Sequence, residues 1–264
     1  MASFDIIKSV GSAYQLVWKE RRYLVRLAAI PFLIKLVCYI VIVALGWEEN
    51  FLRQAIIMLP SYFADGWLFC HLVRLIFLDH RWPFRPSGDT DKDMALLQDR
   101  AAGIMAGALT FTVIKFLLAG ITFVIYEIGQ TSLNAESQDV NPAVFFLMLG
   151  FLVFSFWGFR FLWLYIPAAI NYPLKRFLHN LGGYTASWYL IGTWLLCFLP
   201  LFFIFGKFIS IIGATVEGQT ISIEVQFLAI FFHILLDTGV GLLATAAMAI
   251  GFKDQMFSNG KQKN

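Results

Sequence analysis

Ionisable side chains lie within the most apolar stretches of this sequence. The stretch FWGFRFLWLY (156–165) contains Arg160, with Trp157 and Trp163 three residues to either side. A charged group at the centre of a bilayer costs between ~3 and ~15 kcal/mol, depending on the method, so such residues are candidates for ion pairs, ligand binding or proton transfer. The residues that we single out as a candidate intramembrane charge network or cavity are Asp65, Lys115, Arg160, His233 and Asp237.

Arg160 is predicted to face the interior of a helix bundle. Side chains of a helix tilt toward its N-terminus, and the span that carries Arg160 is predicted to run inward, so the guanidinium points toward the middle of the bilayer. An ion pair with Asp65 or Asp237, with a cation–π contact to Trp157 or Trp163, is the favoured interpretation. Snorkelling or local thinning of the bilayer, and binding of a ligand or ion, remain alternatives. If Arg160 faces lipid with no carboxylate within reach, the hypothesis of a charged cavity fails.

Two lysines in the predicted spans differ in depth. Lys115 lies near mid-membrane and competes with Arg160 for the same carboxylates. Lys35 lies ~13 Å from the cytoplasmic surface by helical rise. We therefore expect Lys35 to reach the lipid headgroups by snorkelling.

The segment HILLD places His233 and Asp237 on one helix face, four residues apart. This spacing would suit a proton relay or two metal ligands, but a third ligand at the same depth is missing. The ordinary interpretation is a hydrogen bond between the two side chains. We therefore predict no metal site and no cofactor here.

Sequence motifs of enzymes are absent. There is no Walker-type loop, no G-x-S-x-G, no H-E-x-x-H, no CxxC and no dinucleotide fingerprint. The cysteines Cys38, Cys70 and Cys197 lie singly in apolar segments and are expected to pack as small apolar residues. The protein is predicted not to be an enzyme, and an intramembrane enzyme using His233 and Asp237 is the least favoured alternative.

The composition requires a membrane. Of the 264 residues, 59% are hydrophobic and 14% are charged, against about 25% charged residues in globular domains. A soluble domain of this length could not bury so much apolar surface. The sequence therefore predicts an all-α polytopic membrane protein with one membrane domain over residues 1–264.

Six segments are long and apolar enough to span a bilayer, which takes about 20 residues. They form three predicted hairpins, each preceded by a short amphipathic helix on the cytoplasmic side. The first of these helices lies within residues 1–23, with Ser3 as its N-cap, and residues 252–264 form a cytoplasmic tail. The predicted spans are 26–47, 53–77, 103–127, 142–167, 187–209 and 225–251.

Basic residues predict the orientation. Fifteen Lys and Arg residues fall on the side of the two termini, whereas the other side has only Arg53 and Lys207. The positive-inside rule then places both termini in the cytoplasm. Topology also explains these basic residues without nucleic-acid binding.

The three-hairpin organisation resembles poorly characterised six-span bacterial inner-membrane families, including the membrane regions attached to some glycerophosphodiester phosphodiesterases. The fourth span also resembles these families, because it exits into a cytoplasmic turn through the segment RFLWLYIPAAINYPLKRFLHNLGG. The resemblance implies a bacterial inner membrane. It implies no particular chemistry, and the chain has no phosphodiesterase catalytic domain.

Two functions suit these features. The favoured one is a non-catalytic accessory, assembly or scaffold component that acts through contacts with the lipid bilayer and with a membrane-protein partner. The alternative is a small transporter or lipid-handling protein with a charged intramembrane cavity. The alternative requires the candidate residues to converge on one cavity.

Overall fold

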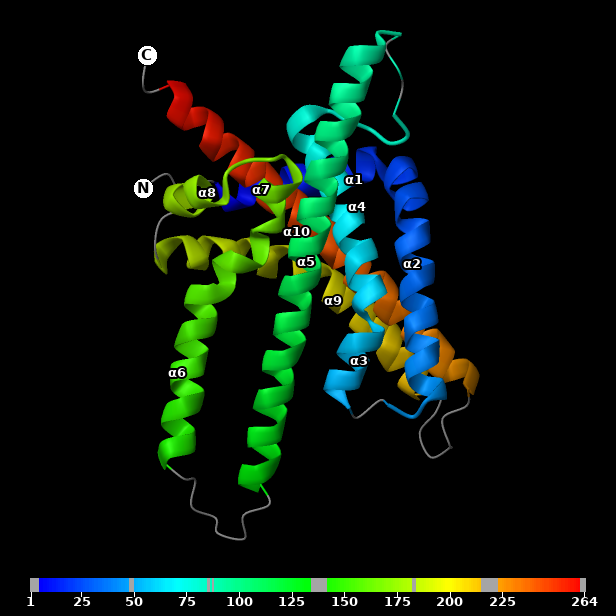
Figure 1. Cartoon of the computed structure of the whole chain (residues 1–264). Coiled ribbons are helices and arrows are strands. Elements are labelled where there is room, and N and C mark those ends of the chain that lie inside the picture. Colours follow the sequence, from blue (N-terminus) through cyan, green and yellow to red (C-terminus); the bar gives the residue numbers. More distant parts are fainter. Residues whose placement is uncertain are drawn as a thin grey trace.

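The computed structural model describes residues 5–47, 50–84, 86, 88–133, 142–181, 184–214 and 223–261. The described chain is a bundle of helices (Figure 1). In chain order they are α1 (Ile6–Lys19), α2 (Arg21–Ala44), α3 (Phe51–Ile57), α4 (Leu59–Leu78), α5 (Thr90–Leu133), α6 (Pro142–Gly158), the 3-10 helix η1 (Phe159–Trp163), α7 (Tyr165–Ala169), α8 (Leu174–Leu181), α9 (Tyr184–Ala214) and α10 (Ile223–Lys261).

Six of these helical segments could cross a membrane by length and composition, which confirms the predicted all-α, multi-pass architecture. The predicted outer connections, 134–141 and most of 215–224, lie outside the described residues. In Figure 1, α5 and α6 both extend toward the end of the molecule opposite the termini. The six segments are Arg21–Ala44, Leu59–Leu78, Thr90–Glu127, Leu149–Ala169, Thr185–Lys207 and Phe227–Gln255.

Two of the three expected short helices are separate elements. α1 packs against α10 and α9, and its N-cap is Asp5, whose carboxylate accepts a hydrogen bond from the Lys8 amide at 3.0 Å; Ser3 lies outside the described residues. α8 follows α7. The segment expected before the third span is instead the first part of the continuous helix α5, and α10 runs through most of the predicted tail.

The fourth span is not one α-helix. Pro167 has no N–H to donate to the carbonyl of Trp163, four residues earlier. The chain therefore passes from α6 through the 3-10 turn η1 into the short α7. Arg160 lies in η1, so the direction that we predicted for its side chain from a straight α-helix does not apply.

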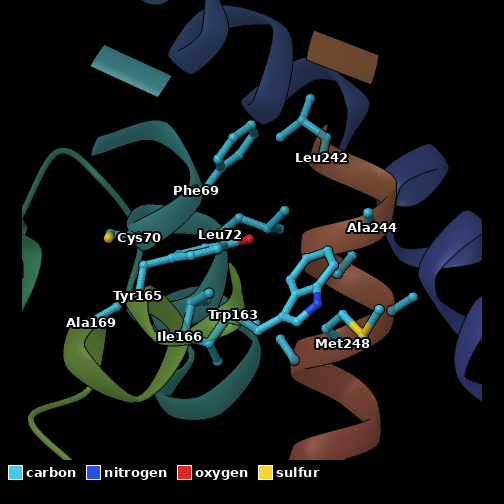
Figure 2. Packing of buried hydrophobic residues seen from close by; sticks show 14 of the residues in the cluster. Phe69, Cys70, Leu72, Trp163, Tyr165, Ile166, Ala169, Leu242, Ala244 and Met248 are labelled. Carbon is cyan, nitrogen blue, oxygen red and sulfur yellow. The ribbon is translucent and has the colours of Figure 1, made fainter. Parts of the chain in front are cut away.

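Small residues allow close packing at the centre of the bundle. A Cβ atom on Gly103 would lie 2.5 Å from the carbonyl oxygen of Ala169, and one on Gly107 would lie 3.1 Å from that of Tyr165. This G-x-x-x-G pair brings α5 against α7, as small residues do in membrane helices. Figure 2 shows the resulting core, in which side chains of α4, of η1 and α7, and of α10 meet.

Candidate functional site

A buried lysine joins three helices in the middle of the bundle. The ammonium of Lys35 on α2 lies 2.7 Å from Oδ2 of Asp65 on α4 and 2.7 Å from Oδ2 of Asp237 on α10. The Lys35 side chain is only 2% exposed. The expectation that Lys35 snorkels to the headgroups is therefore wrong, because the side chain is enclosed between two carboxylates.

The three residues form a charged cluster, which we call the lysine triad (Lys35, Asp65 and Asp237). Two carboxylates around one ammonium give it a formal charge of −1. Within the described part of the chain, Oδ1 of Asp65 is buried and has no hydrogen-bond partner. This oxygen is an acceptor that a ligand or water could satisfy, since buried polar atoms in proteins are nearly always paired.

His233 and Tyr39 lie beside the triad. The Nε2 atom of His233 is 3.0 Å from the Tyr39 hydroxyl, and the two rings meet edge to face. Tyr39, and not Asp237, is thus the hydrogen-bond partner of His233. The predicted bond between His233 and Asp237 is wrong in its partner, although both residues face the same region.

Two cavities meet at the triad. The larger, of about 370 Å³, is lined mainly by aromatic and aliphatic side chains of α4, α5, η1, α9 and α10. The smaller, of about 270 Å³, has a more polar lining that includes Tyr39, Gln54 and Tyr62. The residues that line both cavities are Asp65, Lys115, Leu118, His233 and Asp237.

Lys115 supplies a second positive charge at this junction. In the described structure no carboxylate oxygen lies within 4 Å of its ammonium, so Lys115 is not part of an ion pair with Asp65 or Asp237. Its ammonium lies 5.7 Å from the ring centre of Phe111. Among the described residues, the charge of Lys115 is therefore directed at the cavities without a close counter-ion.

Arg160 lies apart from these cavities and lines neither of them. Its side chain is half-buried, with the guanidinium carbon 4.4 Å from the ring centre of Trp157 and 5.0 Å from that of Phe161. The cation–π contact to Trp157 is confirmed. The predicted ion pair with Asp65 or Asp237 is wrong, because both carboxylates bind Lys35 instead.

Sequence reasoning missed Lys35 as a member of the site, but a signal for it existed. α2 begins at Arg21 and not near residue 26, which places Lys35 ~21 Å along the helix. Asp65 lies ~20 Å before the end of α4 at Leu78, measured from the same end of the bundle. Matching these depths would have paired Lys35 with Asp65.

A second buried ion pair lies nearer the end of the bundle that carries the termini. The Arg74 side chain on α4 is fully buried and donates to Oδ2 of Asp99 at 2.6 Å and to the Ala169 carbonyl at 2.9 Å. Asn171 donates to the other oxygen of Asp99 at 2.7 Å. We call this group the arginine clamp (Arg74, Asp99, Ala169 and Asn171). Asp65 and Arg74, nine residues apart on α4, thus face different neighbours.

Among the described residues, no group of three or more His, Cys, Asp or Glu side chains is placed to hold a metal ion.

Comparison of the chain with protein-family models, with curated proteins and with solved structures finds no match. The function must therefore be inferred from the geometry of the chain itself.

Proposed function

We propose that this chain is a transport or lipid-handling protein of the bacterial inner membrane, with both termini in the cytoplasm. The observation that carries the proposal is the position of the lysine triad, which lies at the boundary between two cavities in the middle of the spans. The charge distribution of the connections supports the orientation.

The larger cavity suits an amphipathic ligand. Its lining combines rings such as Phe69, Trp194 and Phe198 with Lys115 and the carboxylates of Asp65 and Asp237. An acyl chain or apolar ring system would pack on the aromatic side chains, while an anionic head would pair with Lys115. This division between an apolar body and a few polar groups is typical of small-molecule sites.

The triad also suits a switching role. Its ion pairs connect α2, α4 and α10, so these helices cannot separate without breaking them. Breaking a buried ion pair is costly unless new partners replace the lost ones. A ligand head or a proton that satisfies Asp65 or Asp237 would lower that cost and let the two cavities connect.

The accessory role that the sequence favoured predicts an apolar face for a partner helix. α6 exposes apolar side chains around much of its circumference, including Phe146, Leu152 and Phe154, which are all more than half exposed. Lipid covers faces of this kind equally well, so this exposure does not distinguish a partner from the bilayer. The meeting of two cavities at Asp65, Lys115, His233 and Asp237 is the more specific observation, although Arg160 does not converge on them.

Native mass spectrometry of the whole protein, gently extracted from its own membrane, tests the proposal. We expect a monomer or small homo-oligomer that retains a lipid or small molecule. The variant Lys115→Met should lose this adduct, whereas Arg53→Gln, which removes a cation outside both cavities, should keep it. A stoichiometric protein partner with no small-molecule adduct would contradict the proposal and support the accessory role.

A further inference from the structure

A third cavity lies at the end of the bundle that carries the termini, outside the lysine triad. It has a volume of about 930 Å³ and lies between the α1–α2 junction, the loop after α4 and the first part of α5. Five basic residues line it against two acidic ones, Glu20 and Asp79. The basic residues are Lys19, Arg22, Arg26, Arg81 and Arg100.

Internal contacts hold the walls of this cavity in place. Arg81 pairs with Glu20 at 2.9 Å, and Arg100 donates to the Arg81 carbonyl at 2.6 Å. The backbone amide of Trp82 donates to the Tyr23 hydroxyl at 3.1 Å. The loop after α4 is thereby fixed to both α2 and α5, so the cavity is part of the fold and not a gap under a loose loop.

Several cations of the cavity have N–H groups that are available to bind an anion. Lys19, Arg22 and Arg26 are exposed, and no carboxylate lies within 4 Å of them in the part of the chain that the structure describes. Arg100 is 3% exposed, yet its buried Nε has no hydrogen-bond partner among the described residues. Such a donor, buried in the wall of a basic cavity, needs an acceptor that the described chain does not supply.

His80 contributes polarity to the cavity and little charge. Burial and then the nearby Arg74 and Arg100 lower the pKa of His80 below its usual value of 6.5, so the imidazole is neutral at pH 7. Its Nδ1 is also buried without a partner in the described structure. The positive field of the cavity therefore comes from the Lys and Arg side chains.

Apolar residues form the side of the cavity that faces the bilayer. Leu27, Ile30 and Trp67 line it there, and α2 continues from Ile30 with an exposed apolar face that includes Leu33 and Val37. A basic cavity next to an exposed apolar helix face matches a phospholipid, whose phosphate lies at the interface and whose chains lie beside a helix. The positive-inside rule accounts for basic residues on the predicted cytoplasmic side. It does not account for their grouping around one cavity.

We propose that this cavity binds the phosphate group of an anionic ligand, with an anionic phospholipid such as phosphatidylglycerol as its occupant. The exposed guanidiniums of Arg22 and Arg26 pair with the phosphate, and Arg100 donates to it from the wall. Arginine suits this role because its planar donors match two phosphate oxygens at once. This site is independent of the lysine triad and of the function proposed above.

The test is a titration of the delipidated full-length protein, followed by native mass spectrometry and thermal unfolding. The probes are dioleoyl phosphatidylglycerol, dioleoyl phosphatidylcholine and, at constant ionic strength, inorganic phosphate. The variant is Arg22→Gln/Arg26→Gln, in which both side chains are exposed. The matched control is Lys175→Gln/Arg176→Gln, which removes two exposed cations from α8 on the same side but outside the cavity.

We expect phosphatidylglycerol to bind more tightly than phosphatidylcholine. The arginine variant should weaken phosphatidylglycerol binding roughly 25-fold, because each cation near an anionic membrane surface contributes a factor of about five. The control should bind like the original protein. Protection by inorganic phosphate alone, lost in the arginine variant, would support the phosphate site and assign it to a soluble ligand. Equal binding of the two lipids, or equal losses in the variant and control, would overturn the proposal.

Circular dichroism and gel filtration of each variant separate lost binding from lost folding. If Arg22→Gln/Arg26→Gln fails to fold, Arg22→Lys/Arg26→Lys replaces it, since this variant keeps the charge and removes the planar donors. A several-fold weaker affinity for phosphatidylglycerol would then support pairing by the guanidiniums. An unchanged affinity would contradict it.

Discussion

The lysine triad and the arginine clamp are both buried cations with acidic partners, yet their surroundings differ. Arg74 of the clamp binds one carboxylate and one backbone carbonyl in a region where Gly103 and Gly107 bring the helices close together. Lys35 of the triad binds two carboxylates beside two cavities. A charge in tight packing holds helices in one arrangement. A charge beside open space can exchange partners, so the triad is the better candidate for function.

The largest effect is expected from Lys35→Met, which leaves two carboxylates in the bundle without their cation. The Asp65 side chain is only 4% exposed, and removing one partner of a buried pair costs about 4 kcal/mol. Asp237 adds less to this cost, because its side chain is 44% exposed and water can solvate it. The free energy of unfolding, measured by titration with SDS in detergent micelles, should fall by this amount. The neutral variant Lys35→Met/Asp65→Asn/Asp237→Asn should recover most of the loss. An unchanged stability in the single variant would contradict a buried triad.

A smaller loss is expected from Arg74→Met in the clamp. The Asp99 side chain is about half exposed, so water can solvate it when the guanidinium is removed. The variant still loses the hydrogen bonds that the guanidinium donates, and it leaves the Ala169 carbonyl without a donor. Together these losses should lower the free energy of unfolding by roughly 2–3 kcal/mol. The same titration measures it. If Arg74→Met lost more stability than Lys35→Met, the clamp and not the triad would be the site whose cation contributes more to the free energy of unfolding.

The tight packing near the clamp can be tested without changing a charge. In Gly103→Ala the new Cβ would lie 2.5 Å from the Ala169 carbonyl oxygen and 2.6 Å from Nη1 of Arg74. Crowding of this kind costs about 2 kcal/mol. A Cβ added at Gly120 on the same helix would meet no neighbouring side chain or helix of the described structure within 4 Å, so Gly120→Ala is the matched control and should not destabilise the protein. Equal changes in stability at the two glycines would show that helix propensity, and not contact with α7, determines the effect of the substitution.

The smallest effect is expected from Arg160→Gln. Arg160 lines neither cavity, and a cation–π contact such as that with Trp157 contributes about 1 kcal/mol. The small-molecule adduct that we expect in native mass spectrometry should therefore persist. Loss of the adduct in Arg160→Gln but not in Lys115→Met would move the binding site away from the triad.

The sequence was sufficient to predict the architecture, because each of the six spans is a long apolar segment that can be recognised without knowing its neighbours. It was also sufficient to single out Asp65, Lys115, His233 and Asp237, since charged groups stand out in apolar helices. It failed where side-chain direction depends on local backbone. Arg160 lies in a 3-10 turn that no periodicity revealed, and its expected partners are bound to Lys35 instead.

One continuous helix joins the arginine clamp to the junction of the two cavities. α5 carries Asp99 of the clamp and Lys115 at the cavity junction, roughly 24 Å apart along its axis. An unbroken helix between them transmits tilt as a rod does about a pivot, and the close contacts of Gly103 and Gly107 with α7 place that pivot near the clamp. A tilt of α5 about Gly107 would displace the backbone at Lys115, which lies ~12 Å further along the helix. The arrangement of the clamp and the position of the cavity lysine are thus coupled through one helix.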